Sequence, residues 1–274
     1  MQKLALIIDE SGAKNYSDKQ EQYEGEFGIM VGFLIPYEYL EMCKDTSKSI
    51  FHEFKNNGKL HITDLEDNEQ KKLRDKVYML FKEYKVGWFY HGTFVQDFFE
   101  SENKLKLSSN QKSSLHYEVF KGVFFKALDF YRMHCKDIKK IDIEIITDNL
   151  DKGIIKLFKK NLQDSIILMT KRTLSKTLHT YNKETNELIS CTRTSKLEVR
   201  EIEGENIQWE DIQFEIITEN SNLTFIADIL ANSTHYYIKQ EIIKNKDINL
   251  NSKIAVKNHP LKEQVMCCNT FDFK

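Results

Sequence analysis

Five short segments of the chain carry the apolar patterns that predict β-strands. Residues 3–9 form a nearly continuous apolar run, and residues 25–35 form a second one. Residues 85–95 alternate between apolar and polar positions, and residues 141–148 and 213–218 are again short apolar runs. Strands are therefore expected from the beginning to the end of the chain.

Helical periodicity occupies the segments between these strands. In residues 67–84, apolar side chains recur at spacings of three and four residues, which places them on one face of a helix. The same reasoning predicts helices over residues 37–54, 112–135, 152–164 and 222–243. Strands that alternate with helices predict an α/β fold in which helices flank a mixed sheet.

One segment departs from this alternation. Residues 169–200 are rich in threonine and alternate on either side of a turn-like stretch at residues 182–186, which predicts a β-hairpin. An acidic loop over residues 201–211 follows the hairpin. The 274 residues contain no repeat and no Ser, Gly or Pro-rich linker, so we expect a single domain that carries residues 169–211 as an insertion.

Composition narrows the class of protein. The 41% hydrophobic content is enough for a substantial core. No apolar stretch approaches the roughly 18 residues of a membrane span, and no signal peptide precedes the first strand, so we expect a cytoplasmic protein with no membrane partner. The five cysteines lack C-x-x-C spacing, which argues against disulfides and against structural zinc.

The net charge of −2 conceals an uneven distribution. Residues 151–200 contain eleven Lys and Arg against five Asp and Glu, a local charge of +6, so the remainder carries −8. A basic segment beside an acidic remainder fits a phosphate-binding face near a carboxylate cluster. A solvated, charged surface would give the same count.

Two predicted strands end on an aspartate. Asp9 ends the strand over residues 3–9, and Asp148 ends the strand over residues 141–148. Sites on open α/β sheets lie outside the carboxyl ends of the strands, so these two carboxylates would lie close together if their strands are neighbours. Such proximity is costly unless a cation lies between them. Taken singly, either aspartate fits a turn or a cap equally well.

A third aspartate lies in the last predicted helix. Asp228 is surrounded in sequence by apolar residues, in the stretch FIADIL. It belongs to a polar stripe at helical spacing that consists of Ser221, Thr224, Asp228, Asn232 and His235. A buried lone carboxylate is costly, so Asp228 needs a metal, a basic partner or a place at the mouth of a site.

Four local motifs resemble a known family. The stretches IIDESG, KLHITDL, IITDN and LTFIADILAN are similar to signature stretches of the domain-of-unknown-function 3800 family (DUF3800), which implies a ribonuclease H-like fold. This resemblance covers most of the chain. It implies that Asp9, Asp148 and Asp228 form an acidic metal-binding core, with Glu10 and Ser11 lining the site and His61 taking part.

A fourth acidic ligand is not identified by the resemblance. An acidic residue is expected shortly before the histidine, but Lys59 and Leu60 stand there. Glu10, Asp64 and Asp151 are the alternatives. Glu10 can share a site with Asp9 only if the strand has ended, because successive side chains of a strand point to opposite faces. Asp64 also fits a helix cap.

The implied chemistry is hydrolysis of phosphodiester bonds in DNA or RNA by a two-metal-ion mechanism. Oxygen ligands favour Mg²⁺ or Mn²⁺. Asp9 would bridge the two ions, Asp148 and Asp228 would hold one each, and His61 would orient water or carry a proton. The hairpin cations expected to hold the nucleic-acid backbone are Lys171, Arg172, Lys176, Arg193 and Lys196.

Other classes of protein fit less well. An actin-like ATPase needs glycine-rich phosphate loops in its second half, but glycine after residue 122 is limited to Gly153 and Gly204. A haloacid dehalogenase-type phosphotransferase needs Asp-x-Asp, and Ser11 occupies the third position. The stronger alternative is a non-catalytic module that binds nucleic acid or protein in a bacterial defence or mobile-element system. Whether the chain acts as a homodimer stays open.

Overall fold

A computed structural model describes residues 1–14, 20–52, 61–104, 114–148, 150, 152–182, 187–196 and 209–266. Its main element is a five-stranded sheet in the order β3-β2-β1-β4-β7. The strands are β1 (Gln2–Gly12), β2 (Phe27–Pro36), β3 (Trp88–Phe94), β4 (Lys140–Thr147) and β7 (Asp211–Thr218). β1, β4 and β7 are parallel, whereas β2 runs antiparallel to β1 and β3, so the sheet is mixed.

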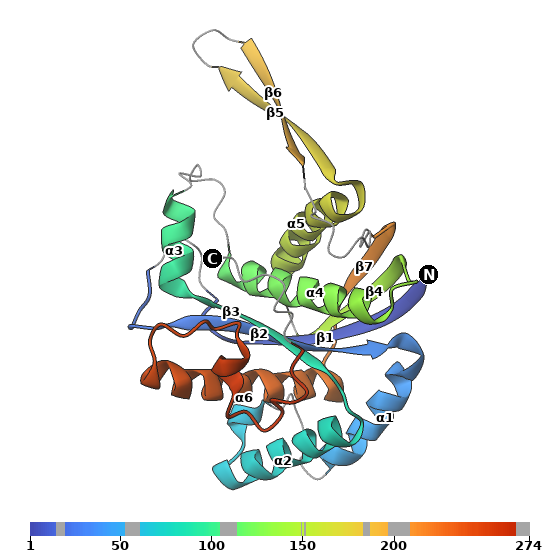
Figure 1. The fold of residues 1–274 in the computed structure, drawn as a ribbon, viewed down its shortest axis with the longest axis vertical. Helices are drawn as coiled ribbons and strands as arrows, with labels where there is room; N and C mark the ends of the chain where they lie inside the picture. Colours follow the sequence, from blue (N-terminus) through green and yellow to red (C-terminus); the bar gives the residue numbers. More distant parts are fainter. Residues whose placement is uncertain are drawn as a thin grey trace.

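Helices cover both faces of the sheet (Figure 1). One face carries α1 (Leu40–Phe51), α2 (Asp67–Glu83) and α6 (Asn222–Lys244), and the other carries α4 (Leu115–His134) and α5 (Lys152–Lys171). The helix α3 (Val95–Lys104) continues directly from β3, and short 3-10 turns occupy Tyr37–Tyr39, Ile62–Asp64 and Lys253–Val256. The expected α/β fold with a mixed sheet flanked by helices is therefore confirmed.

The central strand β1 is buried on both sides. Ala5 and Ile7 belong to the apolar cluster on the α6 face, whereas Leu4, Leu6 and Ile8 belong to the cluster on the α4 face. This explains why its sequence is an unbroken apolar run, since neither face meets water. The alternation continues past the core, so it directs the side chain of Asp9 to the α6 face and that of Glu10 to the α4 face.

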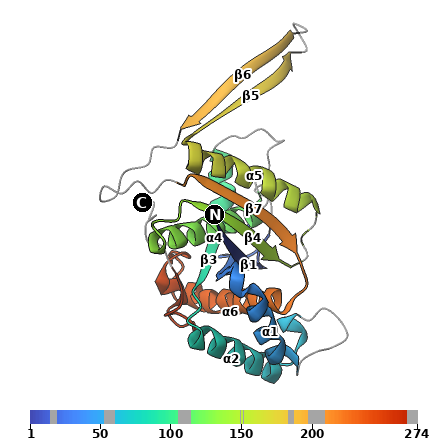
Figure 2. The same ribbon diagram turned by 90° about the vertical axis from the view of Figure 1, so that its right-hand side faces the viewer.

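The strands β5 (Thr173–Asn182) and β6 (Glu187–Lys196) form a separate two-stranded sheet. This hairpin projects away from the body at the end of α5 (Figures 1 and 2). It begins at residue 173, not 169, because the apolar positions Phe158, Leu162 and Ile166 extend the α5 helix to Lys171. The expected acidic loop lies outside the described residues as far as residue 208.

β1 continues to Gly12 instead of ending at Asp9, and the remaining boundaries lie within a few residues of those predicted. The helix α3 was not expected, because among its side chains that the structure describes only Val95 and Phe98 are buried, against Leu115. Among the described residues, no helix has the length and apolar character needed to cross a membrane.

Gly122 lets α4 approach β3 closely. A Cβ atom at this position would collide with the imidazole ring of His91, which is half-buried. Alanine favours an isolated helix over glycine by about 1 kcal/mol. The collision reverses that sign, so we predict that Gly122→Ala lowers the free energy of unfolding by about 1–3 kcal/mol in denaturant titration. Gly153→Ala, at an exposed position in α5, is the control and should not destabilise the protein.

Candidate functional site

Asp9 and Asp148 lie side by side at one edge of the sheet. The parallel register of β1 and β4 ends with Ile8 opposite Thr147, so Asp9 and Asp148 follow as the next residues of two hydrogen-bonded strands. Neighbouring strands are about 4.8 Å apart, and paired positions of parallel strands point to the same face. Both carboxylates therefore belong to the α6 face, as the sequence predicted for neighbouring strands.

Asp228 reaches the same edge from α6. Its charge and that of Asp148 both act on Asp9 strongly enough to raise the pKa of that carboxyl. Asp148 and Asp228, which are remote in sequence from Asp9, are thus both within electrostatic reach of it. We call Asp9, Asp148 and Asp228 the acidic edge.

Asp9 is the most buried member of the acidic edge, with 8% of its surface exposed. Burial is the largest cause that raises its pKa well above the usual value, and the negative charges of Glu10, Asp228 and Asp148 raise it further. A hydrogen bond from the backbone of Glu10 opposes this shift only in part. The carboxylate is therefore held where its charged form is disfavoured.

The turn that contains His61 closes over Asp228. The backbone N–H of Ile62 donates to Asp228 Oδ2 at 3.1 Å, and His61 Nδ1 lies 3.8 Å from the same oxygen. The His61 side chain is 46% exposed, so it faces both Asp228 and solvent. Asp64 instead accepts a hydrogen bond from the His61 backbone N–H at 2.9 Å, which makes it a cap of this turn.

Glu10 does not join the acidic edge. The strand β1 continues to Gly12, so the condition for a site shared by Asp9 and Glu10 is not met. The Glu10 carboxylate forms ion pairs with Lys14 and with His116, whose Nε2 lies 3.6 Å away. Burial would raise the pKa of Glu10, but its contacts with His116 and Lys14 outweigh burial and lower the pKa to about 2.

A carboxylate that the sequence analysis missed continues the acidic edge across β7. The register of β4 and β7 ends with Thr147 opposite Thr218, and the N–H of Glu219 donates to the Thr147 carbonyl at 3.1 Å. Glu219 is therefore the counterpart of Asp148 on the next strand. The sequence carried this signal, because the stretch IIT at the end of β7 is followed by Glu219 in the same way as the stretch IIT at the end of β4 is followed by Asp148.

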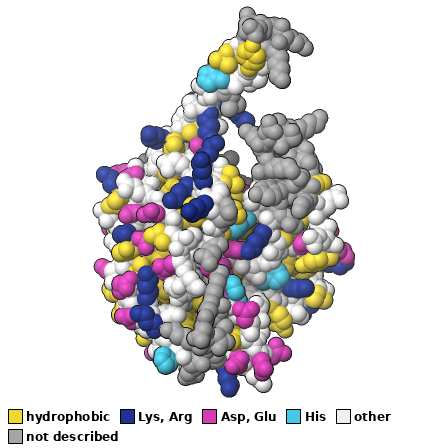
Figure 3. Space-filling model, turned by 180° about the vertical axis from the view of Figure 1, so that it is seen from behind, with side chains coloured by type: hydrophobic (Ala, Val, Ile, Leu, Met, Phe, Trp, Pro, Cys, Tyr) yellow, Lys and Arg dark blue, Asp and Glu magenta, His cyan; other side chains and the backbone are white. Residues whose placement is uncertain are grey.

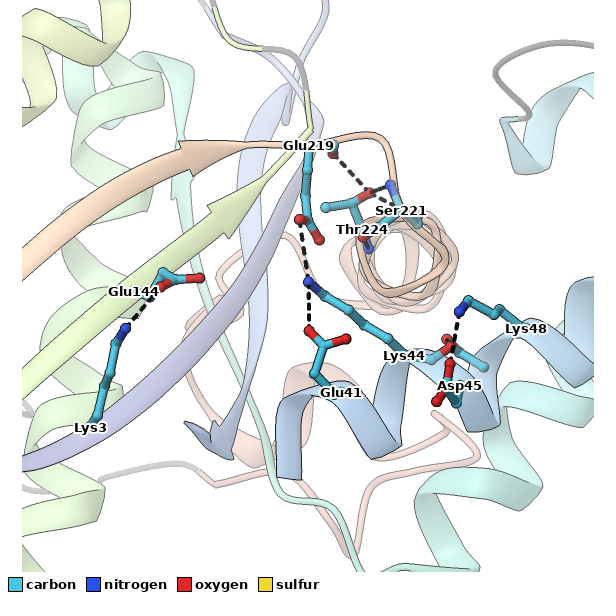
Figure 4. A network of polar contacts seen from close by, with 10 residues as sticks. Lys3, Glu41, Lys44, Asp45, Lys48, Glu144, Glu219, Ser221 and Thr224 are labelled. Carbon is cyan, nitrogen blue, oxygen red and sulfur yellow. Dashed lines mark hydrogen bonds and ion pairs between the residues drawn. The ribbon is translucent and has the colours of Figure 1, made fainter. Parts of the chain in front are cut away.

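Helix α1 supplies a cation for Glu219. Lys44 Nζ lies 3.5 Å from Glu219 Oε2 and 3.4 Å from Glu41 (Figure 4). The Glu219 carbonyl accepts a hydrogen bond from Thr224 Oγ1, which ties the strand end to the first turn of α6. Within the described part of the chain, Glu219 Oε1 is buried and has no hydrogen-bond partner. In Glu219, Oε2 is thus paired with Lys44, whereas Oε1 has no hydrogen-bond partner among the described residues.

The carboxylate oxygens of the acidic edge are of the chemical type that Mg²⁺ and Mn²⁺ prefer as ligands, but these side chains are not arranged around a common ion. Aspartate and glutamate oxygens are the ligands these ions prefer, and the raised pKa of Asp9 reflects negative charge that a cation would relieve. Across the described ranges, however, no three His, Cys, Asp or Glu side chains are arranged to hold one metal ion. The carboxylates would have to turn towards one another. Asp151, the last alternative for a fourth ligand, lies outside the described residues.

The five predicted hairpin cations lie away from the acidic edge. Lys171 ends α5, Arg172 follows it, and Lys176, Arg193 and Lys196 are on the hairpin strands. Lys and Arg side chains gather at the base of the hairpin in the view from behind (Figure 3). α5 starts four residues after Asp148 and is itself about 30 Å long, and the hairpin begins at its far end.

Comparison with protein-family models, with curated proteins and with solved structures finds no match to this chain.

The burial of Asp9 predicts that its charge destabilises the metal-free protein. The folded state has the higher pKa, so it binds more protons than the unfolded state, and stability falls as pH rises from about 3.8 through the folded pKa. Asp9→Asn removes the charge. We expect it to raise the free energy of unfolding at neutral pH, on the order of 1 kcal/mol, in denaturant titrations with EDTA.

The pH dependence separates this effect from a general one. The gain from Asp9→Asn should shrink as pH falls and vanish below about pH 4, where wild-type Asp9 is protonated. Asp45→Asn is the control, because Asp45 is exposed and paired with Lys48. Destabilisation by Asp9→Asn at neutral pH would contradict the prediction.

Proposed function

We propose that this protein is a metal-dependent nuclease with a ribonuclease H-like fold, as the resemblance to the DUF3800 family predicts. One observation carries the proposal: Asp9, on the central strand, is nine-tenths buried and lies within electrostatic reach of both Asp148 and Asp228. Proteins do not ordinarily gather buried like charges without a cation or a proton to relieve them. The mixed sheet with helices on both faces supports the fold assignment.

Each residue of the acidic edge has a role in this proposal. Asp9, Asp148 and Asp228 would hold Mg²⁺ or Mn²⁺, which when bound would neutralise charge on the phosphodiester and lower the pKa of the attacking water. His61 is placed beside Asp228 and exposed to solvent, so it would orient that water or accept its proton. Lys44 would hold the Glu219 side chain directed to the same edge.

A non-catalytic nucleic-acid-binding module is the second candidate. It is favoured by the lack, among the described residues, of three ligands already arranged around one ion. It is also favoured by the distance between the basic hairpin and the acidic edge, since backbone binding would not need the carboxylates. A cleavage assay separates the two functions.

Asp9→Asn, Asp148→Asn and Asp228→Asn should each reduce cleavage of DNA or RNA in Mn²⁺ by roughly 100-fold or more. Asp45→Asn is the control, because Asp45 is exposed on α1 and paired with Lys48, and this variant should retain most of the activity. Mn²⁺ should also raise the melting temperature of the wild type but not that of Asp9→Asn. Cleavage at the wild-type rate in all three aspartate variants would refute the proposed site.

Glu219 provides a separate test of how far the site extends. Glu219→Gln should lower cleavage about tenfold and weaken the Mn²⁺-dependent rise in melting temperature, because it removes a charge next to Asp148. Glu215→Gln is the matched control, with the same change on the same strand at an exposed position. Equal effects of the two substitutions would exclude Glu219 from the site.

A further inference from the structure

The hairpin is an arm that the core of the fold does not require. Its two strands pair at ten positions, and its described side chains are exposed apart from those next to α5. Lys176 forms an ion pair with Asp164 of α5, which fastens the base of the arm. An isolated two-stranded ribbon is marginal in water, so a function outside the core is needed to account for it.

One face of the hairpin is a ladder of polar groups. Ser175 and Thr194 are hydrogen-bonded across the strands at 2.9 Å, as are Thr177 and Thr192. His179 Nδ1 and the Ser190 hydroxyl continue the ladder at 2.8 Å. Hydroxyl groups both donate and accept, so this face can contact phosphates or base edges.

On the other face, Lys176 is directly opposite Arg193 in the register of β5 and β6. The ion pair with Asp164 offsets the charge of Lys176, and Arg193 is an exposed cation that a polyanion could contact. At the base of the ladder face, Lys196 lies opposite Thr173, close to Lys171 and Arg172 in the chain.

The shape of the arm favours duplex DNA over other nucleic acids. A two-stranded ribbon fits the major groove of B-form DNA, which is about 12 Å wide, whereas the major groove of A-form RNA is too deep and narrow. Proteins that bind single strands stack bases on rows of aromatic side chains. The described part of the hairpin offers one tyrosine, Tyr181, near the tip.

We propose that the β5–β6 hairpin is an arm that binds duplex DNA in its B form. This inference deepens the proposed function by naming the nucleic acid, and it can be tested without cleavage.

The binding test uses the full-length chain in EDTA, so that its outcome does not depend on the metal site. Fluorescence anisotropy with labelled DNA duplexes of about 20 base pairs should give an affinity roughly tenfold weaker for Arg193→Ser combined with Lys196→Ser. The plot of log affinity against log salt should lose up to about 2 units of slope, or about 0.9 for each phosphate contact removed. These two substitutions leave the Lys176–Asp164 ion pair in place. Lys82→Ser with Lys262→Ser is the matched control, with the same charge change at exposed positions outside the hairpin.

The outcomes distinguish the alternatives. An equal loss of DNA affinity in the hairpin double variant and the control double variant would overturn the proposal. Tighter binding of duplex RNA or of single strands than of duplex DNA would overturn it too. A hairpin variant that keeps its DNA affinity but changes its mass in solution would instead identify the arm as a contact between copies of this chain. If DNA binding depends on the hairpin but Asp9→Asn does not change the cleavage rate, the proposed nuclease site is refuted. The proposal for the hairpin as a DNA-binding arm would still hold.

Discussion

Burial of β1 on both faces is the constraint on which the site depends. A strand between two layers of helices must give apolar side chains to both, and its pleat then assigns every later residue to one face or the other. Asp9 is placed opposite α6 for this reason, and Glu10 is placed against α4. The neighbours β4 and β7 run parallel to β1, so their ends bring Asp148 and Glu219 to the same edge. No local feature of the acidic edge could replace this arrangement.

The cost of gathering these carboxylates is spread over several elements. Glu10 is compensated by Lys14 and His116 on one face, and Glu219 is compensated by Lys44 of α1 on the other. The largest influences on the pKa of Asp9 are burial, three negative charges and one backbone hydrogen bond, and none of them is a cation. The least compensated carboxylate is thus the one at the centre of the sheet, where a ligand would contact both neighbouring strands.

Much of the fold was predictable because its strands are either unbroken apolar runs or regular alternations. The ends of elements were less predictable. β1 extends to Gly12 because it remains paired with β2 as far as Gly28, and long-range pairing of this kind leaves no mark on the local sequence. The α5 helix extends to Lys171 for a similar reason, since its apolar face continues to pack under the sheet.

Residues of the candidate site were predictable from the sequence where an acidic residue ends a strand. They were less predictable where their place in the site depends on the sheet face to which a side chain points. Asp9 and Asp148 could be paired from the apolar character of their strands, whereas the separation of Asp9 from Glu10 required knowing where β1 ends. Glu219 follows a strand in the same way as Asp148, but the prediction was based on aspartates at strand ends and did not include this glutamate. Asp64 was expected to cap the helix that follows, but it caps the turn at Ile62–Asp64 instead, and Glu66 is the N-cap of α2.

The hydrogen bond from the Ile62 N–H to Asp228 has a consequence for how the acidic edge would fill. A carboxylate oxygen has two lone pairs, so Asp228 Oδ2 could accept the Ile62 N–H and contact a cation at the same time. The turn over residues 61–64 would then fix the direction of the Asp228 carboxylate from outside, and it would hold His61 in place beside that carboxylate.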